Sequence, residues 1–221
     1  MDGMTISLLL VDDHPIIVSG LSAALAEDPN IEIVGTAGTL ADARSEIAQF
    51  NPDVVLLDLR LPDGSGTELL AESQSEQGGP AFIVLSTFLT AQYVNAAIAL
   101  GASGFLLKTS PVAEIVGAVV DVVGGRLAFT AEQLHASRRA GWTPLTRREH
   151  DIIDGVMQGR SNDELSGGLA LSRKTVEAYL SRLFERFEVA TRTELAILAE
   201  REQWLDLPVQ RTGPNRHDRA N

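Results

Sequence analysis

The stretch VVLLDLRLPDGSG, residues 54–66, changes abruptly from apolar to polar composition. Its four apolar residues end at Asp58, and Pro62, Asp63 and Gly64 follow as turn-forming residues. An apolar run of this length, rich in branched residues, is typical of a strand buried on both faces of a parallel sheet. The stretch therefore predicts a buried strand that delivers Asp58 to one edge of a sheet.

Similar apolar runs occur on either side of this stretch, and helical segments separate them. The expected strands are residues 6–11, 31–34, 54–57, 82–85 and 104–107. The expected helices are 15–27, 40–50, 91–100 and 111–123, with Pro15, Thr39, Thr90 and Pro111 suited to their first turns or caps. Repeated strand–helix units in about 125 residues predict an α/β fold with a doubly wound, five-stranded parallel sheet.

Polar residues follow four of these strands. Asp12 and Asp13 follow the first, Asp58 ends the third, Ser86 and Thr87 end the fourth, and Lys108 follows the fifth. The carboxyl ends of parallel strands share one edge, so these groups should converge there. An isolated Asp after a strand is often only a turn residue. Clustered carboxylates, however, favour a bound Mg²⁺, and an Asp can accept a phosphoryl group while a lysine and a hydroxyl bind its oxygens.

The second half of the chain has a different pattern. Capping-box sequences begin at Thr146, Ser161 and Thr191, and Ser172 can cap a further helix. Helices are expected over about 147–158, 162–169, 173–187 and 192–203. Short helices joined by short turns predict a small all-α domain of the helix-turn-helix kind.

The charged residues are also distributed differently between the two halves of the chain. The chain has 221 residues and a net charge of −12, of which residues 1–125 carry −13 and residues 126–221 carry +1. The total therefore does not exclude nucleic-acid binding by the second half.

The absence of cysteine excludes disulfides, thiol nucleophiles and thiolate metal sites. No apolar stretch is long enough to span a membrane, and the N-terminus is unlike a signal peptide, so a cytoplasmic location is expected.

The four motifs of the first half match a known family in order and spacing. LLLVDDHP (8–15), VVLLDLRLPDGSG (54–66), IVLST (83–87) and GFLLKTSP (104–111) resemble a flavodoxin-like response-regulator receiver domain over residues 4–125. This resemblance implies that Asp58 is the phosphoacceptor. It further implies that Asp12, Asp13, Asp58 and the Arg60 backbone carbonyl hold Mg²⁺, and that Ser86, Thr87 and Lys108 bind the phosphoryl group. Phe105 stands at the aromatic switch position, and core packing is the alternative role.

The second half resembles the LuxR-type DNA-binding domain over residues 144–200, from LTRREHD to ELAILA. Together the two resemblances indicate a two-component response regulator of the NarL/FixJ type. They imply a receiver (4–125), a linker (126–143) with a short helix from Thr130, a DNA-binding domain (144–207) and a disordered tail (208–221). The implied partners are a sensor histidine kinase, promoter DNA, a second copy of the chain through helix 192–203, and RNA polymerase.

The recognition helix of this resemblance is 173–187, and it departs from the family pattern. Glu177 and Tyr179 stand where a basic residue and a histidine are usual. Glu177 weakens phosphate attraction but can accept a hydrogen bond from a cytosine amine. The basic and hydroxyl residues expected at phosphates are Arg173, Lys174, Thr175, Arg182 and Arg186, and those expected at base edges are Glu177, Ala178 and Ser181.

Other functions remain open at this point. The regulator could work without phosphorylation, through a ligand or a constitutive dimer. A phosphohydrolase of the haloacid-dehalogenase kind also uses an Asp nucleophile, but its second Asp is absent here because Leu59 and Arg60 follow Asp58. A protein-binding module that no longer contacts DNA is a further alternative. The expectation is a non-enzyme whose only chemistry is phosphoryl transfer to Asp58 and its slow hydrolysis.

Overall fold

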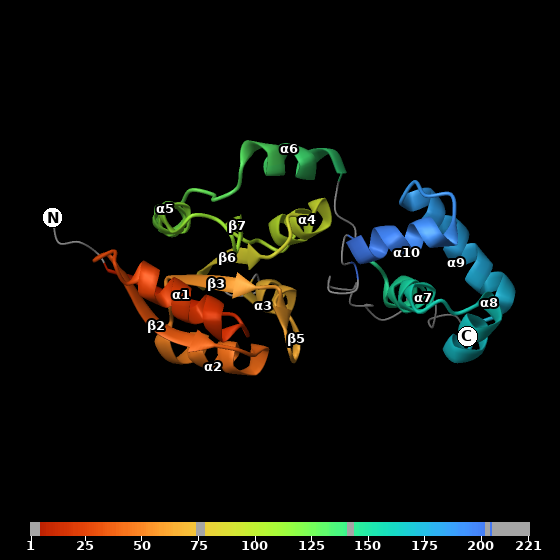
Figure 1. The fold of residues 1–221 in the computed structure, drawn as a ribbon, viewed down its shortest axis with the longest axis horizontal. Coiled ribbons are helices and arrows are strands. Elements are labelled where there is room, and N and C mark those ends of the chain that lie inside the picture. Colours follow the sequence, from red (N-terminus) through yellow and green to blue (C-terminus); the bar gives the residue numbers. More distant parts are fainter. Residues whose placement is uncertain (1–4, 74–77, 141–143, 202–203, 205–221) are drawn as a thin grey trace, which may run out of the picture. The chain divides into compact units, whose positions relative to one another are not determined.

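The structure is a computed structural model that describes residues 5–73, 78–140, 144–201 and 204 (Figure 1). Its chain contacts divide it into two compact units, Met1–Trp142 and Thr143–Asn221. Each unit has its own core and is described here by itself. None of the helices in the described ranges is long and apolar enough to cross a membrane.

The first unit contains a five-stranded, fully parallel sheet with the strand order β2-β1-β3-β6-β7. The strands are β1 (Ile6–Val11), β2 (Ile31–Ala37), β3 (Val54–Asp58), β6 (Ala81–Ser86) and β7 (Gly104–Leu107). The helices that connect them are α1 (Pro15–Leu25), α2 (Leu40–Phe50), α3 (Thr67–Ser73) and α4 (Ala91–Ala99), and α5 (Val112–Val123) follows β7. The doubly wound fold expected from the sequence is confirmed. The strand order reverses between β1 and β3, the place where such folds bind ligands.

Both faces of the sheet are buried, which explains the unbroken apolar runs. Leu8, Leu10 and Leu56 lie on one face in a cluster with Leu25 of α1 and Ile115 of α5. Alternate strand residues, which point to the opposite face, are equally buried. The central strands therefore cannot expose polar residues along their length, and their functional groups stand only at their ends.

Some elements differ from the expectations. The helix α3 and the short hairpin β4 (Arg60–Leu61) and β5 (Gly64–Ser65) were not predicted, because each has few residues and little periodicity. Strand β2 continues past Val34 to Ala37, since its pairing with β1 continues there after an irregularity. Helix α4 ends at Ala99, and Gly101 adopts a φ of +80°, a conformation that favours glycine.

The segment after α5 packs on the first unit. Ala128 forms a parallel bridge with Gly104 at the outer edge of β7: its N–H donates to Ser103 (2.7 Å) and its carbonyl accepts from Phe105 (3.1 Å). Helix α6 (Ala131–Ala140) then packs along α4. The sequence prediction of a helix from Thr130 agrees with a Thr130 hydroxyl that accepts from the Gln133 N–H (3.1 Å). This segment therefore covers an otherwise unpaired strand edge.

The second unit consists of α7 (Arg147–Met157), α8 (Asn162–Leu169), α9 (Arg173–Arg186) and α10 (Arg192–Arg201). Its core includes Ile152 and Ile153 of α7, Leu165 of α8, Leu183 of α9 and Leu195 of α10. The shape is the small helical domain expected from the sequence, with α8 and α9 packed as a helix-turn-helix pair.

The predicted caps of this unit are mostly present. Thr146 and Ser161 form complete capping boxes with the glutamates three residues on, and Ser172 caps α9. The third predicted box is incomplete. Thr191 accepts from the Glu194 N–H (3.1 Å), but the Glu194 carboxylate accepts from the N–H of Ala190 at 2.8 Å, one residue before the position of a capping box.

Candidate phosphorylation site and DNA-binding helix

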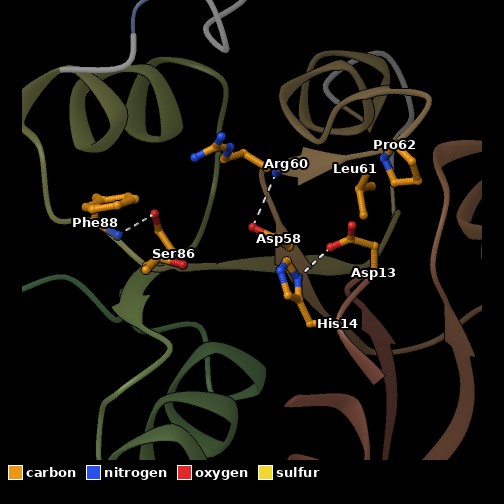
Figure 2. Close-up of a pocket in the computed structure, with 9 residues that line it drawn as sticks. Asp13, His14, Asp58, Arg60, Leu61, Pro62, Ser86 and Phe88 are labelled. Atoms are coloured by element: carbon orange, nitrogen blue, oxygen red, sulfur yellow. Dashed lines mark hydrogen bonds and ion pairs between the residues drawn. The ribbon is translucent and has the colours of Figure 1, made fainter. Parts of the chain in front are cut away.

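Four of the six polar residues predicted at the strand ends of the first unit line one pocket, and the side chains of the other two, Asp12 and Lys108, are buried next to it, where Lys108 pairs with Asp58. Asp13 and His14 line it beside Asp58, and Ser86 lines its other side (Figure 2). Thr87 is also one of its lining residues. The pocket has a volume of about 430 Å³. One ligand atom from each of Asp12, Asp13, His14 and Asp58 lies within 4.8 Å of the others, a grouping able to hold a metal ion. The topology thus brings together carboxylates that are up to 46 positions apart in the chain.

Lys108 joins two of these carboxylates. Its Nζ lies 2.6 Å from Asp12 Oδ2 and 2.7 Å from Asp58 Oδ2. The side chains of all three are at most 7% exposed. Lys108 reaches this position because its N–H is anchored to the Ser86 carbonyl (2.8 Å), at the end of the neighbouring strand. The ammonium therefore occupies the position at which a phosphoryl group on Asp58 would need a counter-charge.

The electrostatics of the pair reflect this burial. Burial raises the pKa of the Asp58 carboxyl, and the hydrogen bond from Lys108 only partly opposes the effect. Burial alone would lower the pKa of Lys108, but hydrogen bonds to Asp12 and Asp58 outweigh it and raise that pKa. The hydrogen bonds to Asp12 and Asp58 therefore favour the cationic form of Lys108, whereas burial disfavours the charged form of Asp58.

The pocket carries more negative charge than Lys108 alone can balance. The carboxylates of Asp12, Asp13 and Asp58 meet one buried ammonium and the exposed ring of His14, whose Nδ1 lies 2.6 Å from Asp13 Oδ1. This oxygen-rich set fits a small divalent cation such as Mg²⁺, which prefers carboxylates, backbone carbonyls and water. His14 stands at the N-cap of α1 but makes no side-chain capping bond.

The other predicted residues of the receiver-like pocket occupy distinct places. The Arg60 N–H donates to Asp58 Oδ1 (3.3 Å), and the Arg60 side chain extends away from Asp13 (Figure 2). Ser86 is buried, and its Oγ accepts from the Phe88 N–H (3.2 Å), which holds the start of the β6–α4 loop. Phe105 is 1% exposed and packs in the core, so the structure shows its packing role.

Two residues that support the pocket were not identified from the sequence. Asp63 accepts from the N–H groups of Leu40 (2.7 Å) and Ala41 (3.1 Å), so the loop after Asp58 caps α2. These hydrogen bonds lower the pKa of Asp63. A Cβ at Gly66 would lie 2.3 Å from the Asp58 carbonyl oxygen, so only glycine fits next to the Asp58 backbone. The motif PDGSG contains both residues, but only the fold shows their partners.

The predicted DNA-binding residues all lie on α9 of the second unit. Val176, Leu180 and Leu183 bury one side of this helix. Lys174, Ala178, Ser181 and Arg182 are exposed on the opposite side, and Glu177 is also exposed and accepts from Arg173 Nε. Thr175 Oγ1 lies 2.7 Å from the hydroxyl of the capping residue Ser172. The helix thus presents a continuous polar side that is free of the core.

Comparisons with known proteins assign the family. Residues 8–120 match the response regulator receiver domain, and residues 143–199 match the luxR family of bacterial regulatory proteins. The chain is 32% identical over 203 residues to the transcriptional activator DevR/DosR of Mycobacterium tuberculosis, covering 88% of this chain and 94% of the relative. The chain is a response regulator of the NarL/FixJ type.

Further relatives agree with this assignment. The response regulator is 35% identical over 191 residues to the transcriptional regulatory protein MctR of Rhizobium johnstonii, covering 84% of this chain and 89% of the relative. It resembles the solved structure of ChrA, from a heme-sensing two-component system, with 30% identity, a TM-score of 0.51, and coverage of 91% and 99%. The response regulator therefore combines a receiver domain with a DNA-binding domain and regulates transcription, as the motifs predicted. The domain boundaries and the roles of single residues stay predictions.

Proposed function

We propose that this response regulator is switched by transfer of a phosphoryl group from a sensor histidine kinase to Asp58. The observation that carries the proposal is the buried bridge of Lys108 between Asp12 and Asp58. A bond forms between an Asp58 carboxylate oxygen and phosphorus, while the donor leaves with the electrons of the broken bond. A small acyl phosphate would serve as an alternative donor.

The residues around Asp58 have separate roles in this proposal. Asp12, Asp13, Asp58 and the carbonyl of Arg60 would hold Mg²⁺, which supplies charge neutralisation for the phosphoryl oxygens when bound. Lys108 turns from Asp12 toward the new phosphoryl oxygens. Ser86 and Thr87 donate hydrogen bonds to these oxygens. Ser86 Oγ then no longer accepts the hydrogen bond from the Phe88 N–H. No turnover of an external substrate is expected, only slow hydrolysis of the phosphoryl-aspartate.

Phosphorylation is proposed to control dimerisation and DNA binding. When the β6–α4 loop and Phe105 shift in the phosphorylated protein, the population of the dimer increases. Helix α10 is the segment proposed for dimerisation, and Ile197 on it is 62% exposed. Promoter DNA is contacted through α9, by Arg173, Lys174, Thr175, Glu177, Ala178, Ser181, Arg182 and Arg186. RNA polymerase is a further partner, and the cytoplasm is the expected location.

Phosphorylation is tested by incubation with acetyl phosphate and MgCl₂, followed by intact-mass measurement. Wild type should gain the mass of one phosphoryl group, and Asp58→Asn should gain none. The control is Asp53→Asn, which removes an exposed carboxylate at the opposite end of β3 and should label normally. Equal labelling of wild type and Asp58→Asn would assign the site elsewhere. A wild type that never labels, yet binds DNA, would favour the phosphorylation-independent regulator.

Dimerisation is tested on the same samples by sedimentation velocity. The labelled wild type should sediment as a dimer and Asp58→Asn as a monomer under identical conditions. An identical sedimentation coefficient for the labelled and unlabelled protein would show that phosphorylation does not control assembly.

A further inference from the structure

The four cations of α9 are not equivalent, because two of them already have carboxylate partners. Arg173 lies between two acids, with Nη1 3.2 Å from Asp163 Oδ1 on α8 and Nε 3.1 Å from Glu177 Oε1. Arg186 Nη1 lies 3.4 Å from Glu149 Oε2 of α7, within the capping box of that helix. Contact with a DNA phosphate would require either arginine to give up part of this pairing.

The other two cations, Lys174 and Arg182, have no carboxylate within 4.0 Å among the residues that the structure describes. Arg182 is held in another way. Its guanidinium carbon lies 4.5 Å from the centroid of the Tyr179 ring, and its Nε donates to the Ala178 carbonyl (3.3 Å). An aromatic face attracts a guanidinium without cancelling its charge, so the group is oriented and still cationic. Tyr179 is itself half-buried, which anchors the ring.

The spacing of these two cations suits a recognition helix. Lys174 and Arg182 are eight residues apart on α9, which is a rise of about 12 Å along the axis, and both lie on the side opposite Leu180. A recognition helix lies in the major groove of DNA, beside the phosphate backbone. Two exposed cations at this separation can therefore contact two different phosphates of the groove that the helix enters.

We propose that Lys174 and Arg182 carry the phosphate contacts of α9, with Tyr179 as the positioning residue for Arg182, while Arg173 and Arg186 remain paired with carboxylates of their own domain. The proposal rests on the proposed DNA contact through α9 and narrows the set of contacting residues, because it removes Arg173 and Arg186 from the phosphate contacts and assigns Glu177 to Arg173. Both departures from the family pattern then have a physical role. Glu177 binds Arg173 and keeps it from the DNA, and Tyr179 orients Arg182 toward it.

The salt dependence of DNA affinity tests this division. Full-length protein, incubated with acetyl phosphate and a fixed concentration of MgCl₂, is titrated against a fluorescein-labelled random-sequence 30-base-pair duplex at NaCl concentrations between 50 and 200 mM. Each lost phosphate contact lowers the slope of log K against log salt by about 0.9 per bound subunit. Lys174→Ala and Arg182→Ala should each show this loss. The matched controls Arg173→Ala and Arg186→Ala should show less than half of it.

The positioning role of Tyr179 has its own readout. Tyr179→Phe keeps the aromatic face and should retain the wild-type slope, whereas Tyr179→Ala should lose part of the Arg182 contribution. In the Arg182→Ala background, Tyr179→Ala should have no further effect on the slope, because the group it orients is gone. Additive effects of the two changes would overturn the positioning role.

A gain of function completes the test. The double variant Asp163→Asn/Glu177→Gln releases Arg173 from both acids, so its slope should become steeper by up to about 0.9 per subunit. Calorimetry on every variant identifies loss of folding. If Arg186→Ala unfolds the domain, Arg186→Met is used as the control variant instead, because methionine preserves the packing of the arginine side-chain stem. Equal slope losses for all four cations would overturn the inference while leaving DNA binding intact. A wild type without salt-dependent binding would instead refute the proposed DNA contact.

Discussion

Removal of Lys108 should destabilise the receiver domain strongly. In Lys108→Met, Asp12 and Asp58 keep their burial but lose the ammonium that lies within 2.7 Å of both. Their carboxylate oxygens lie within 4.8 Å of one another. Two like charges at that distance repel by about 3.5 kcal/mol at an effective dielectric constant of about 20. Breaking a buried ion pair costs a similar amount, so we expect a loss of about 3 kcal/mol in the free energy of unfolding.

Differential scanning calorimetry at low ionic strength and without divalent cations measures this loss, because it can resolve separate transitions of the two domains. For a domain of this size, about 3 kcal/mol corresponds to a decrease of about 10 °C in the receiver Tm. The matched control is Arg44→Met. Arg44 pairs with Glu72 at 2.9 Å, but both side chains are more than 40% exposed, so less than about 1 kcal/mol should be lost.

Magnesium should reverse much of the effect. In Lys108→Met the three carboxylates lack their cation, and MgCl₂ at ten times its Kd stabilises the folded state by about 1.4 kcal/mol. The same addition should raise the Tm of wild type less, because Lys108 already offsets part of the negative charge of Asp12 and Asp58 there. A Lys108→Met protein as stable as Arg44→Met, or one indifferent to MgCl₂, would refute the idea that Lys108 balances a buried acidic cluster.

Three further variants test features that lie outside the pocket. Gly104→Val should release the Ala128 bridge, since a Cβ there would lie 2.7 Å from Ala128 Cβ. Hydrogen exchange should show faster exchange at residues 105 and 128, whereas the control Gly117→Ala meets no atom within 4 Å and should leave both protected. Asp63→Ala should lower the stability of the receiver domain at pH 7, because the N–H groups of Leu40 and Ala41 at the start of α2 lose their acceptor. The pKa of Asp63 is lower in the folded than in the unfolded state. Its contribution to the free energy of unfolding is therefore complete above the unfolded-state pKa of about 4 and is lost as the pH falls through the folded-state pKa. The urea denaturation curves of wild type and Asp63→Ala should accordingly converge in acid. Ser161→Ala should lower the stability of the second domain by about 1 kcal/mol in the same assay, and no change in either unfolding midpoint would contradict the capping argument.

The parts that were predictable from the sequence are those determined by strand topology. Asp12, Asp58 and Lys108 each stand at the end of an apolar run, and parallel strands bring such ends together whatever the helices between them do. Their convergence therefore followed from hydropathy and from the right-handed crossover rule. The capping boxes at Thr146 and Ser161 were equally local, because both partners lie within one turn of helix.

The parts that were not predictable depend on contacts between distant segments. Asp63 reads as a turn residue, and its capping of Leu40 appears only when the β3–α3 loop meets the start of α2. Helix α3 was missed because seven residues with a single apolar pair, Leu69 and Leu70, give no periodic signal. The pairing of Ala128 with β7 left no pattern in the chain, since one alanine at a strand edge resembles any linker residue.

Strand β7 joins the pocket to the linker segment within five residues. At its carboxyl end it delivers Lys108, whose Nζ contacts Asp58. Three residues earlier, both backbone groups of Phe105 face the linker: the N–H donates to Ala128 (3.1 Å), and the carbonyl accepts from Gln133 Nε2 (3.4 Å). A strand of this length has little freedom to move at one end alone, because it is paired with β6 along its whole length on its other edge. A movement of Lys108 therefore either changes only the conformation of its side chain or shifts the β7 backbone. In the second case the hydrogen bonds of Phe105 move Ala128 and Gln133 as well.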